Sequence, residues 1–165
     1  MISSSVQQPL SSSASNWKAE AEAALADFIQ VAQLAGYSLS SSDLVVEFLG
    51  SPHRPPARLP SGKMALYAFF GNGRWLKVGI AGHKSQARYT SQHYNPGSAP
   101  STLAASLMND AEMACCDGFS MDSPGAWIQS SCHRLNVLID AEHGRPLLAL
   151  LEAFLHARLK PRYER

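Results

Sequence analysis

Four polar side chains that suit phosphate chemistry occur along the chain in the order Tyr67, Lys77, Arg88 and Glu152. A positive charge beside a phenol favours the phenolate and makes the tyrosine a better base. A guanidinium can donate a forked pair of hydrogen bonds to phosphate oxygens. A carboxylate supplies the oxygen ligand that a hard divalent cation prefers. If the fold brings these groups together, they have the chemistry to hydrolyse a phosphodiester.

Glu152 stands alone in an apolar stretch, LLALLEAFLHARL, as the only acidic residue between Gly144 and Tyr163. At helical spacing its neighbours are leucines and His156. Burying a lone carboxylate among leucines is costly unless the carboxylate has a partner. A divalent cation that keeps water ligands is one such partner, and an ion pair with His156 or a nearby arginine is the alternative.

The charges are segregated along the chain although the net charge is only +1. No Asp or Glu occurs between Phe48 and Asn109, a stretch that carries seven Lys or Arg residues. A second basic group closes the chain, at Arg158, Lys160, Arg162 and Arg165. Such segregation predicts a basic face that meets a polyphosphate backbone, with a chance distribution of surface charge as the alternative.

Composition divides the chain into four stretches. Residues 1–15 are rich in Ser and Gln, which predicts a disordered tail. Residues 16–50 are predicted to form an N-terminal helical extension, whose first helix ends at Gly36. Residues 51–63 contain four prolines and predict a linker. Residues 64–165 are predicted to form the main domain.

The main domain begins with two apolar stretches joined by Gly71-Asn72-Gly73, the signature of a hairpin. Residues 44–49 are predicted to be a strand or a helical turn. The other expected elements are strands at 64–70, 74–80 and 135–139, helices at 85–94, 101–116 and 146–159, and a loop at 116–126. This order predicts an α/β (α+β) fold, in which helices flank a small, three-stranded, largely antiparallel sheet.

The length of the hairpin turn decides which residues face Tyr67. A three-residue turn with Gly73 in the left-handed position is the favoured register, and it pairs Tyr67 with Lys77, so that the phenol and the ammonium become neighbours. A two-residue turn at Asn72-Gly73 pairs Tyr67 with Val78 instead. In either register, the alternative to a chemical role is that Tyr67 is a half-buried residue of the sheet and that the Lys77 side chain extends past it.

The order of these residues resembles the GIY-YIG nuclease superfamily. Ala65-Leu66-Tyr67 matches the first tripeptide, Lys77-Val78-Gly79 the second, Arg88 the helix arginine and Glu152 the metal-binding glutamate. The resemblance covers residues 64–164. The chain departs from the usual pattern at Ala65 and Lys77, and KPRYE stands where the family often has an Asn after the last helix. A lysine in place of the second-motif tyrosine is similar to some restriction-enzyme-like members.

The resemblance implies a DNA endonuclease that hydrolyses a phosphodiester with one Mg²⁺ or Mn²⁺ ion. Its implied catalytic residues are Tyr67, Lys77, Arg88, His93 and Glu152, with Glu152 as the metal ligand. His93 is expected to contact a phosphate or relay a proton. The implied partner is double-stranded DNA, a homodimer is left open, and the expected DNA contacts are Arg74, Lys84, Arg88, Lys160 and Arg162. A non-catalytic nucleic-acid-binding module on the same scaffold is the alternative.

Other classes of protein find little support in the sequence. No apolar run approaches the roughly 18 residues of a membrane span, and no signal peptide is evident, so a cytoplasmic protein is expected. Cys115, Cys116 and Cys132 lack paired CxxC spacing and are expected to be structural or incidental thiols rather than part of a metal cluster with His133. No GxSxG or Walker-type motif occurs, which argues against acyl transfer and NTP hydrolysis.

Overall fold

The computed structural model describes residues 16–163, so the tail predicted to be disordered, 1–15, lies outside the described residues. This part of the chain contains five α-helices and four strands, together with short 3₁₀ helices. The helices are α1 (Asn16–Leu34), α2 (Gln86–Thr90), α3 (Leu103–Met108), α4 (Pro124–Ser131) and α5 (Gly144–Leu159). The strands are β1 (Val45–Leu49), β2 (Lys63–Gly71), β3 (Arg74–Ala81) and β4 (His133–Asp140). The predicted mixed helix and sheet fold is therefore confirmed.

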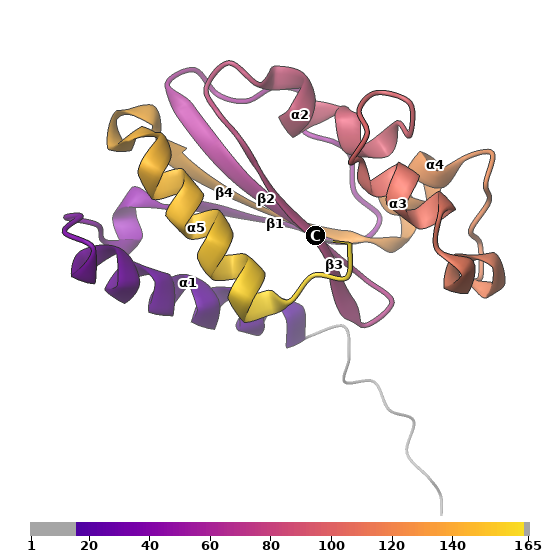
Figure 1. Cartoon of the computed structure of the whole chain (residues 1–165), viewed down its shortest axis with the longest axis horizontal. Coiled ribbons are helices and arrows are strands. Elements are labelled where there is room, and N and C mark those ends of the chain that lie inside the picture. The colour runs from indigo at the N-terminus through magenta and orange to yellow at the C-terminus, as the bar shows by residue number, and fades with distance from the viewer. Residues whose placement is uncertain (1–15, 164–165) are drawn as a thin grey trace, which may run out of the picture.

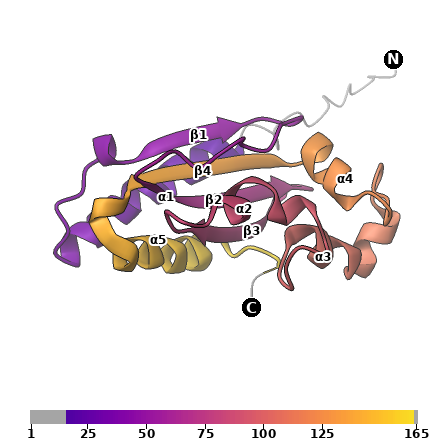
Figure 2. The same cartoon turned by 90° about the horizontal axis from the view of Figure 1, so that it is seen from above.

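The sheet has four strands in the order β1-β4-β2-β3, and all neighbours are antiparallel. Figure 2 shows the strands side by side, with β1 at one edge and β3 at the other. Three strands were predicted, and the fourth is β1, from the segment that was left open between a strand and a helical turn. This strand is short and only partly buried. Its backbone hydrogen bonds within the sheet are made with β4, which lies far away in the sequence.

Helices cover both faces of the sheet. Helices α1 and α5 pack on one face, and α2, α3 and α4 lie on the other (Figure 1). Each face has its own apolar cluster because the side chains of a strand alternate between the two faces. On β2 the residues that share a face with Tyr67 are Ala65 and Phe69, and they point toward α2 to α4.

The β2–β3 hairpin differs from both predicted registers. Its turn has two central residues, Asn72 and Gly73, with left-handed φ angles of 51° and 71°. A bulge then adds one residue to β3, so Tyr67 pairs with Gly79 and Lys77 pairs with Phe69. Both predicted partners of Tyr67 were therefore wrong, because a turn signal in the sequence does not reveal a bulge further along the strand.

The helical segments between β3 and β4 are shorter than predicted. The helix expected at 101–116 is divided into α3 and a 3₁₀ helix, Ala111–Cys115, because the Asp110 side chain accepts the Glu112 backbone N–H and starts a new turn. The helix expected at 85–94 becomes α2 and the 3₁₀ helix Gln92–Tyr94. The loop predicted at 116–126 was partly wrong, since α4 begins there at Pro124, a residue that suits a first helical turn.

Candidate functional site

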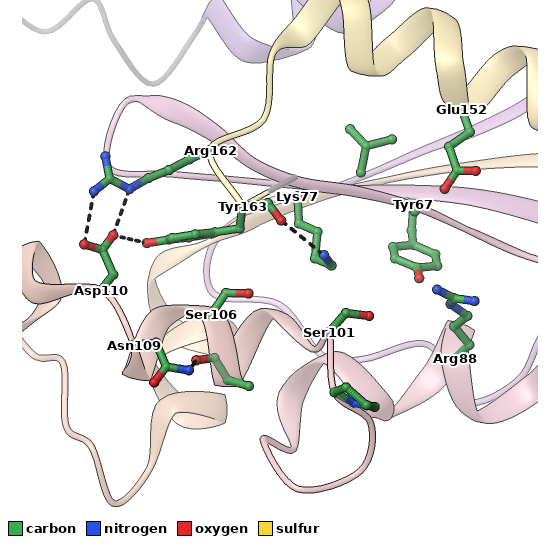
Figure 3. Close-up of a pocket in the computed structure, with 14 residues that line it drawn as sticks. Tyr67, Lys77, Arg88, Ser101, Ser106, Asn109, Asp110, Glu152, Arg162 and Tyr163 are labelled. Atoms are coloured by element: carbon green, nitrogen blue, oxygen red, sulfur yellow. Dashed lines mark hydrogen bonds and ion pairs between the residues drawn. The ribbon is translucent and has the colours of Figure 1, made fainter. Parts of the chain in front are cut away.

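A cleft of about 890 Å³ lies where β2 and β3 meet α2, α3, α5 and the C-terminal segment. Four of the five predicted catalytic residues line it (Figure 3). They are Tyr67, Lys77, Arg88 and Glu152. The rest of the lining is Val78, Gly79, Pro100, Ser101, Ala105, Ser106, Asn109, Asp110, Arg162 and Tyr163. The four predicted residues, which are separated by up to 85 positions in the sequence, are thus brought to one surface.

Tyr67 lies at the floor of this cleft and is buried. Its ring extends across the adjacent strand, where a Cβ atom at Gly79 would lie 2.6 Å from Tyr67 Oη. The Arg88 guanidinium lies close enough to the same oxygen for its charge to oppose the rise in the pKa of the phenol. Figure 3 shows the Tyr67 hydroxyl directed toward the Arg88 guanidinium, with the Glu152 carboxylate on its other side. The phenol is therefore the point at which the predicted residues converge.

His93 is the one predicted catalytic residue that does not line the cleft. It is buried behind the phenol, with Nε2 2.7 Å from Tyr67 Oη. The Leu103 backbone N–H donates to Nδ1 at 3.2 Å, so the proton of the neutral ring is on Nε2 and is donated to Tyr67. This placement argues against the expected phosphate contact, because the ring has no surface facing the cleft.

Burial shifts the pKa values of these two neighbours in opposite directions and favours the neutral form of each. It lowers the pKa of His93 to about 3, and the charges of Lys77, Arg134 and Arg88 act in the same direction. Burial raises the pKa of Tyr67, but Arg88 and Arg134 oppose this rise. The histidine is therefore neutral at ordinary pH and acts as a hydrogen-bond donor.

Lys77 occupies the middle of the cleft on the same sheet face as Tyr67. Only 7% of the residue is exposed, and Nζ donates to the Tyr163 backbone carbonyl at 3.4 Å. The C-terminal segment reaches this position because the Arg162 and Tyr163 N–H groups donate to the carbonyls of Trp75 and Leu76 on β3. The tail thus forms part of the site by pairing beside the bulged strand.

Arg88 and Glu152 reach the cleft from helices on opposite faces of the sheet. Arg88 is exposed on α2, and Glu152 is half-buried on the flank of α5. On α5 the leucines at 147, 148, 151, 155 and 159 are buried in the core. The register of this apolar stripe turns Glu152 toward the β3 edge of the sheet, over which the Tyr67 phenol extends (Figure 3).

Two of the arginines expected to contact DNA form ion pairs with acidic side chains. Arg162 bonds Asp110 at 2.8 and 3.1 Å and pairs with Glu112 at 3.0 Å. Arg74 pairs with Glu112 at 3.1 Å. Hydrogen bonds from Arg162 and Tyr163 hold the pKa of Asp110 at about 2. One end of the cleft is therefore charge-compensated, a consequence of acids at 110 and 112 that lie just beyond the acid-free stretch.

The remaining expected contacts differ in their position. Arg88 lines the cleft, whereas Lys84 and Lys160 are exposed outside its lining. Lys160 has a left-handed φ of 47° and ends α5. Arg145 was not singled out in the sequence, but its Nη1 lies 3.7 Å from a Cβ placed on Gly82, beside Lys84 in the chain. Arg88, Lys84 and Arg145 therefore lie toward the α2 end of the cleft, whereas Lys160 lies at the C-terminal end of α5.

Sequence reasoning missed a buried polar network behind Tyr67. Its centre is Arg134 on β4, which is 1% exposed and donates to Asn136 Oδ1, Tyr94 Oη and the Tyr89 carbonyl at 2.8, 3.0 and 2.6 Å. Asn136 in turn donates to Glu47 on β1 at 3.0 Å. The only sequence signal was the pair of polar residues Arg134, just before, and Asn136, within, the otherwise apolar stretch 135–139.

Metal ligands are sparse in the described residues. Among residues 16–163, no group of three or more His, Cys, Asp or Glu side chains could hold a metal ion. Cys115, Cys116 and Cys132 are free thiols, and Cys132 is buried. Glu152 and Asp110 both line the cleft, but the Asp110 carboxylate is held by Arg162 and Tyr163. Mg²⁺ suits such a site, because it keeps several waters and is often held by one or two carboxylates together with substrate phosphate.

Comparison with known proteins gave no relative. No family description, curated protein or solved structure matches this chain. Within residues 16–163, none of the helices is long and apolar enough to cross a lipid bilayer. Function must therefore be inferred from the cleft itself.

Proposed function

We propose that the protein is a metal-dependent DNA endonuclease of the GIY-YIG type. The observation that carries the proposal is the convergence of Tyr67, Lys77, Arg88 and Glu152 on one cleft. These groups supply a base, two cations and a metal ligand, which is the set that phosphodiester hydrolysis requires. The small antiparallel sheet flanked by helices supports the same proposal.

Glu152 fits one Mg²⁺ or Mn²⁺ ion, since its carboxylate faces the cleft and leaves room for water and phosphate oxygens. When bound, the ion supplies Lewis-acid stabilisation of the charge that develops on the phosphate and the leaving oxygen. Arg88 lies at the cleft surface and donates to the non-bridging phosphate oxygens. The guanidinium thereby stabilises the charge of the transition state.

Tyr67 acts as a phenolate, formed when its own proton is lost to solvent, and takes up a proton from the attacking water. Three features of its surroundings suit this role. The residue lines the cleft, His93 donates to its oxygen, and Arg88 and Lys77 add positive charge beside it. The two cations favour negative charge on the phenol, and the His93 donor holds its oxygen in place.

The test is cleavage of a supercoiled plasmid and of a defined duplex with Mg²⁺, Mn²⁺ or EDTA. We expect cleavage only with metal, and we expect Glu152→Gln to abolish turnover while DNA affinity is largely kept, because phosphate contacts dominate binding. Glu142→Gln, an exposed acid just before α5, is the matched control. Turnover that survives Glu152→Gln would refute the metal assignment. Binding without cleavage under all metal conditions would favour the non-catalytic module.

A further inference from the structure

A buried cation lies directly behind the candidate catalytic tyrosine. The Arg134 guanidinium carbon is 5.5 Å from the centroid of the Tyr67 ring and 5.2 Å from that of Phe69. Tyr89 and Tyr94 present their rings at 5.1 and 6.0 Å. Desolvating a charged group is costly, and ring faces recover part of that cost through cation–π attraction. The arginine is thus enclosed by four aromatic rings, one of which borders the cleft.

The hydrogen bonds of this guanidinium all go to neutral groups. Its acceptors are an amide oxygen, a phenol and a backbone carbonyl, on Asn136, Tyr94 and Tyr89. Among the described residues, no carboxylate pairs directly with Arg134. A buried arginine that served only stability would normally pair with a carboxylate, because removing an uncompensated charge from water is expensive.

The carboxylate of this network belongs to Glu47 and is separated from Arg134 by the Asn136 side chain. Glu47 accepts from Asn136 Nδ2 at 3.0 Å, and its charge adds to the burial that raises the pKa of the Tyr89 phenol. These residues form one row across the sheet, because Glu47 pairs with Asn136, Asn136 with Tyr67, and Tyr67 with Gly79. The amide therefore separates the two charges and leaves the positive one beside the phenol.

We propose that Arg134 is a positioning residue for Tyr67, a fixed buried cation that holds the ring and keeps positive potential behind its hydroxyl. Asn136 acts as the neutral spacer that prevents Glu47 from cancelling this potential. The inference rests on the proposed function, in which Tyr67 contacts the attacking water. Because this cation is fixed in place, it favours the phenolate form in which Tyr67 takes up the proton of the attacking water.

An exchange of charge between two positions tests this role. The double variant Glu47→Gln/Asn136→Asp moves the carboxylate next to Arg134 and the amide to β1. Net charge, side-chain shape and the number of hydrogen bonds are retained, so a merely structural role predicts no loss of activity. We expect kcat to fall by roughly threefold or more, with DNA affinity and melting temperature unchanged. On a Tyr67→Phe background, the exchange should cause no further fall.

A second readout does not depend on catalysis. Tyrosine labelled with ¹³C at Cζ gives five signals, and Tyr67→Phe identifies the one of interest. At neutral pH without metal, we expect the double variant and Glu47→Gln alone to move the Tyr67 signal in opposite directions, since one reduces and the other increases the positive potential. The Tyr37 signal should stay in place. A stationary Tyr67 signal, or shifts of the same sign, would overturn the role of Arg134 even if the protein cleaves DNA. The expected shifts in a protein that cleaves nothing would instead refute only the proposed function.

Discussion

The phenol of Tyr67 occupies the space that a side chain at Gly79 would need. The two residues are direct cross-strand partners, and a Cβ at 79 would lie 2.6, 2.8 and 2.9 Å from three atoms of the tyrosine. Heavy atoms cannot approach so closely, so glycine at this position is what allows the hydroxyl to reach over β3. Gly79 therefore affects the site through Tyr67, because its lack of a side chain leaves room for the phenol.

Gly79→Ala should displace Tyr67 from its place between Arg88 and His93. We expect turnover to fall at least about tenfold, because a small misplacement of a reacting group is costly. Overpacking should also lower the free energy of unfolding by about 1–3 kcal/mol. Gly50→Ala is the control, since nothing lies within 4 Å of a Cβ there. Metal-dependent cleavage and urea unfolding measure the two effects, and full activity in Gly79→Ala would contradict the steric account.

Tyr67→Phe removes the hydroxyl but keeps the buried ring. We expect a loss of about 10²–10⁴-fold in kcat, the usual contribution of a positioned acid or base. The His93 Nε2–H loses its acceptor, so stability should fall by about 1–3 kcal/mol. DNA affinity, measured by fluorescence anisotropy, should be nearly unchanged. Tyr37→Phe provides the comparison, and near-normal kcat in Tyr67→Phe would exclude the phenol as the base.

Stability should depend on pH through His93. Burial lowers its pKa to about 3 from an ordinary value of 6.5, so between these values the unfolded chain binds more protons than the folded one. The free energy of unfolding therefore falls as the pH drops below about 6.5, by at most about 1.4 kcal/mol per pH unit for this group.

His93→Gln offers a test, since glutamine does not titrate and its amide can both donate to Tyr67 and accept from Leu103. Urea unfolding at several values between about pH 7 and pH 5 should show a shallower loss of stability than in the wild type. Exposed His83→Gln should retain the original slope. An unchanged slope in His93→Gln would mean that other groups carry the dependence.

Basic residues should separate into those that contact DNA and those that hold the fold. Lys84→Ala and Arg88→Ala should each reduce the magnitude of the salt dependence of DNA binding by about one ion, as expected for a phosphate contact. Arg74→Ala should leave that slope nearly unchanged, because Glu112 already compensates this arginine. Affinity measured over a range of salt concentrations distinguishes the cases. An equal loss of slope for Arg74 would show that DNA displaces Glu112.

Local sequence signals were sufficient for most of the elements. The apolar stretch ending in LEAFLHARL predicted α5, and the apolar composition of residues 64–70 predicted β2. Asn72 and Gly73 predicted the turn because both residues tolerate a positive φ angle. The order of Tyr67, Lys77, Arg88 and Glu152 was likewise sufficient to nominate four residues that line one cleft.

Long-range contacts decided what no local pattern encodes. The bulge that pairs Tyr67 with Gly79 depends on how β3 fits β2 and the C-terminal segment, so the predicted registers were wrong. The place of His93 behind the phenol arises from the Leu103 N–H ten residues later. Arg134 could not be recognised from its neighbours in sequence, since its surroundings are rings brought together from β2, α2 and the 3₁₀ helix that follows α2. Helical and strand periods depend on neighbours a few residues apart, whereas charge compensation and burial depend on distances in space, which only the assembled sheet and its helices determine.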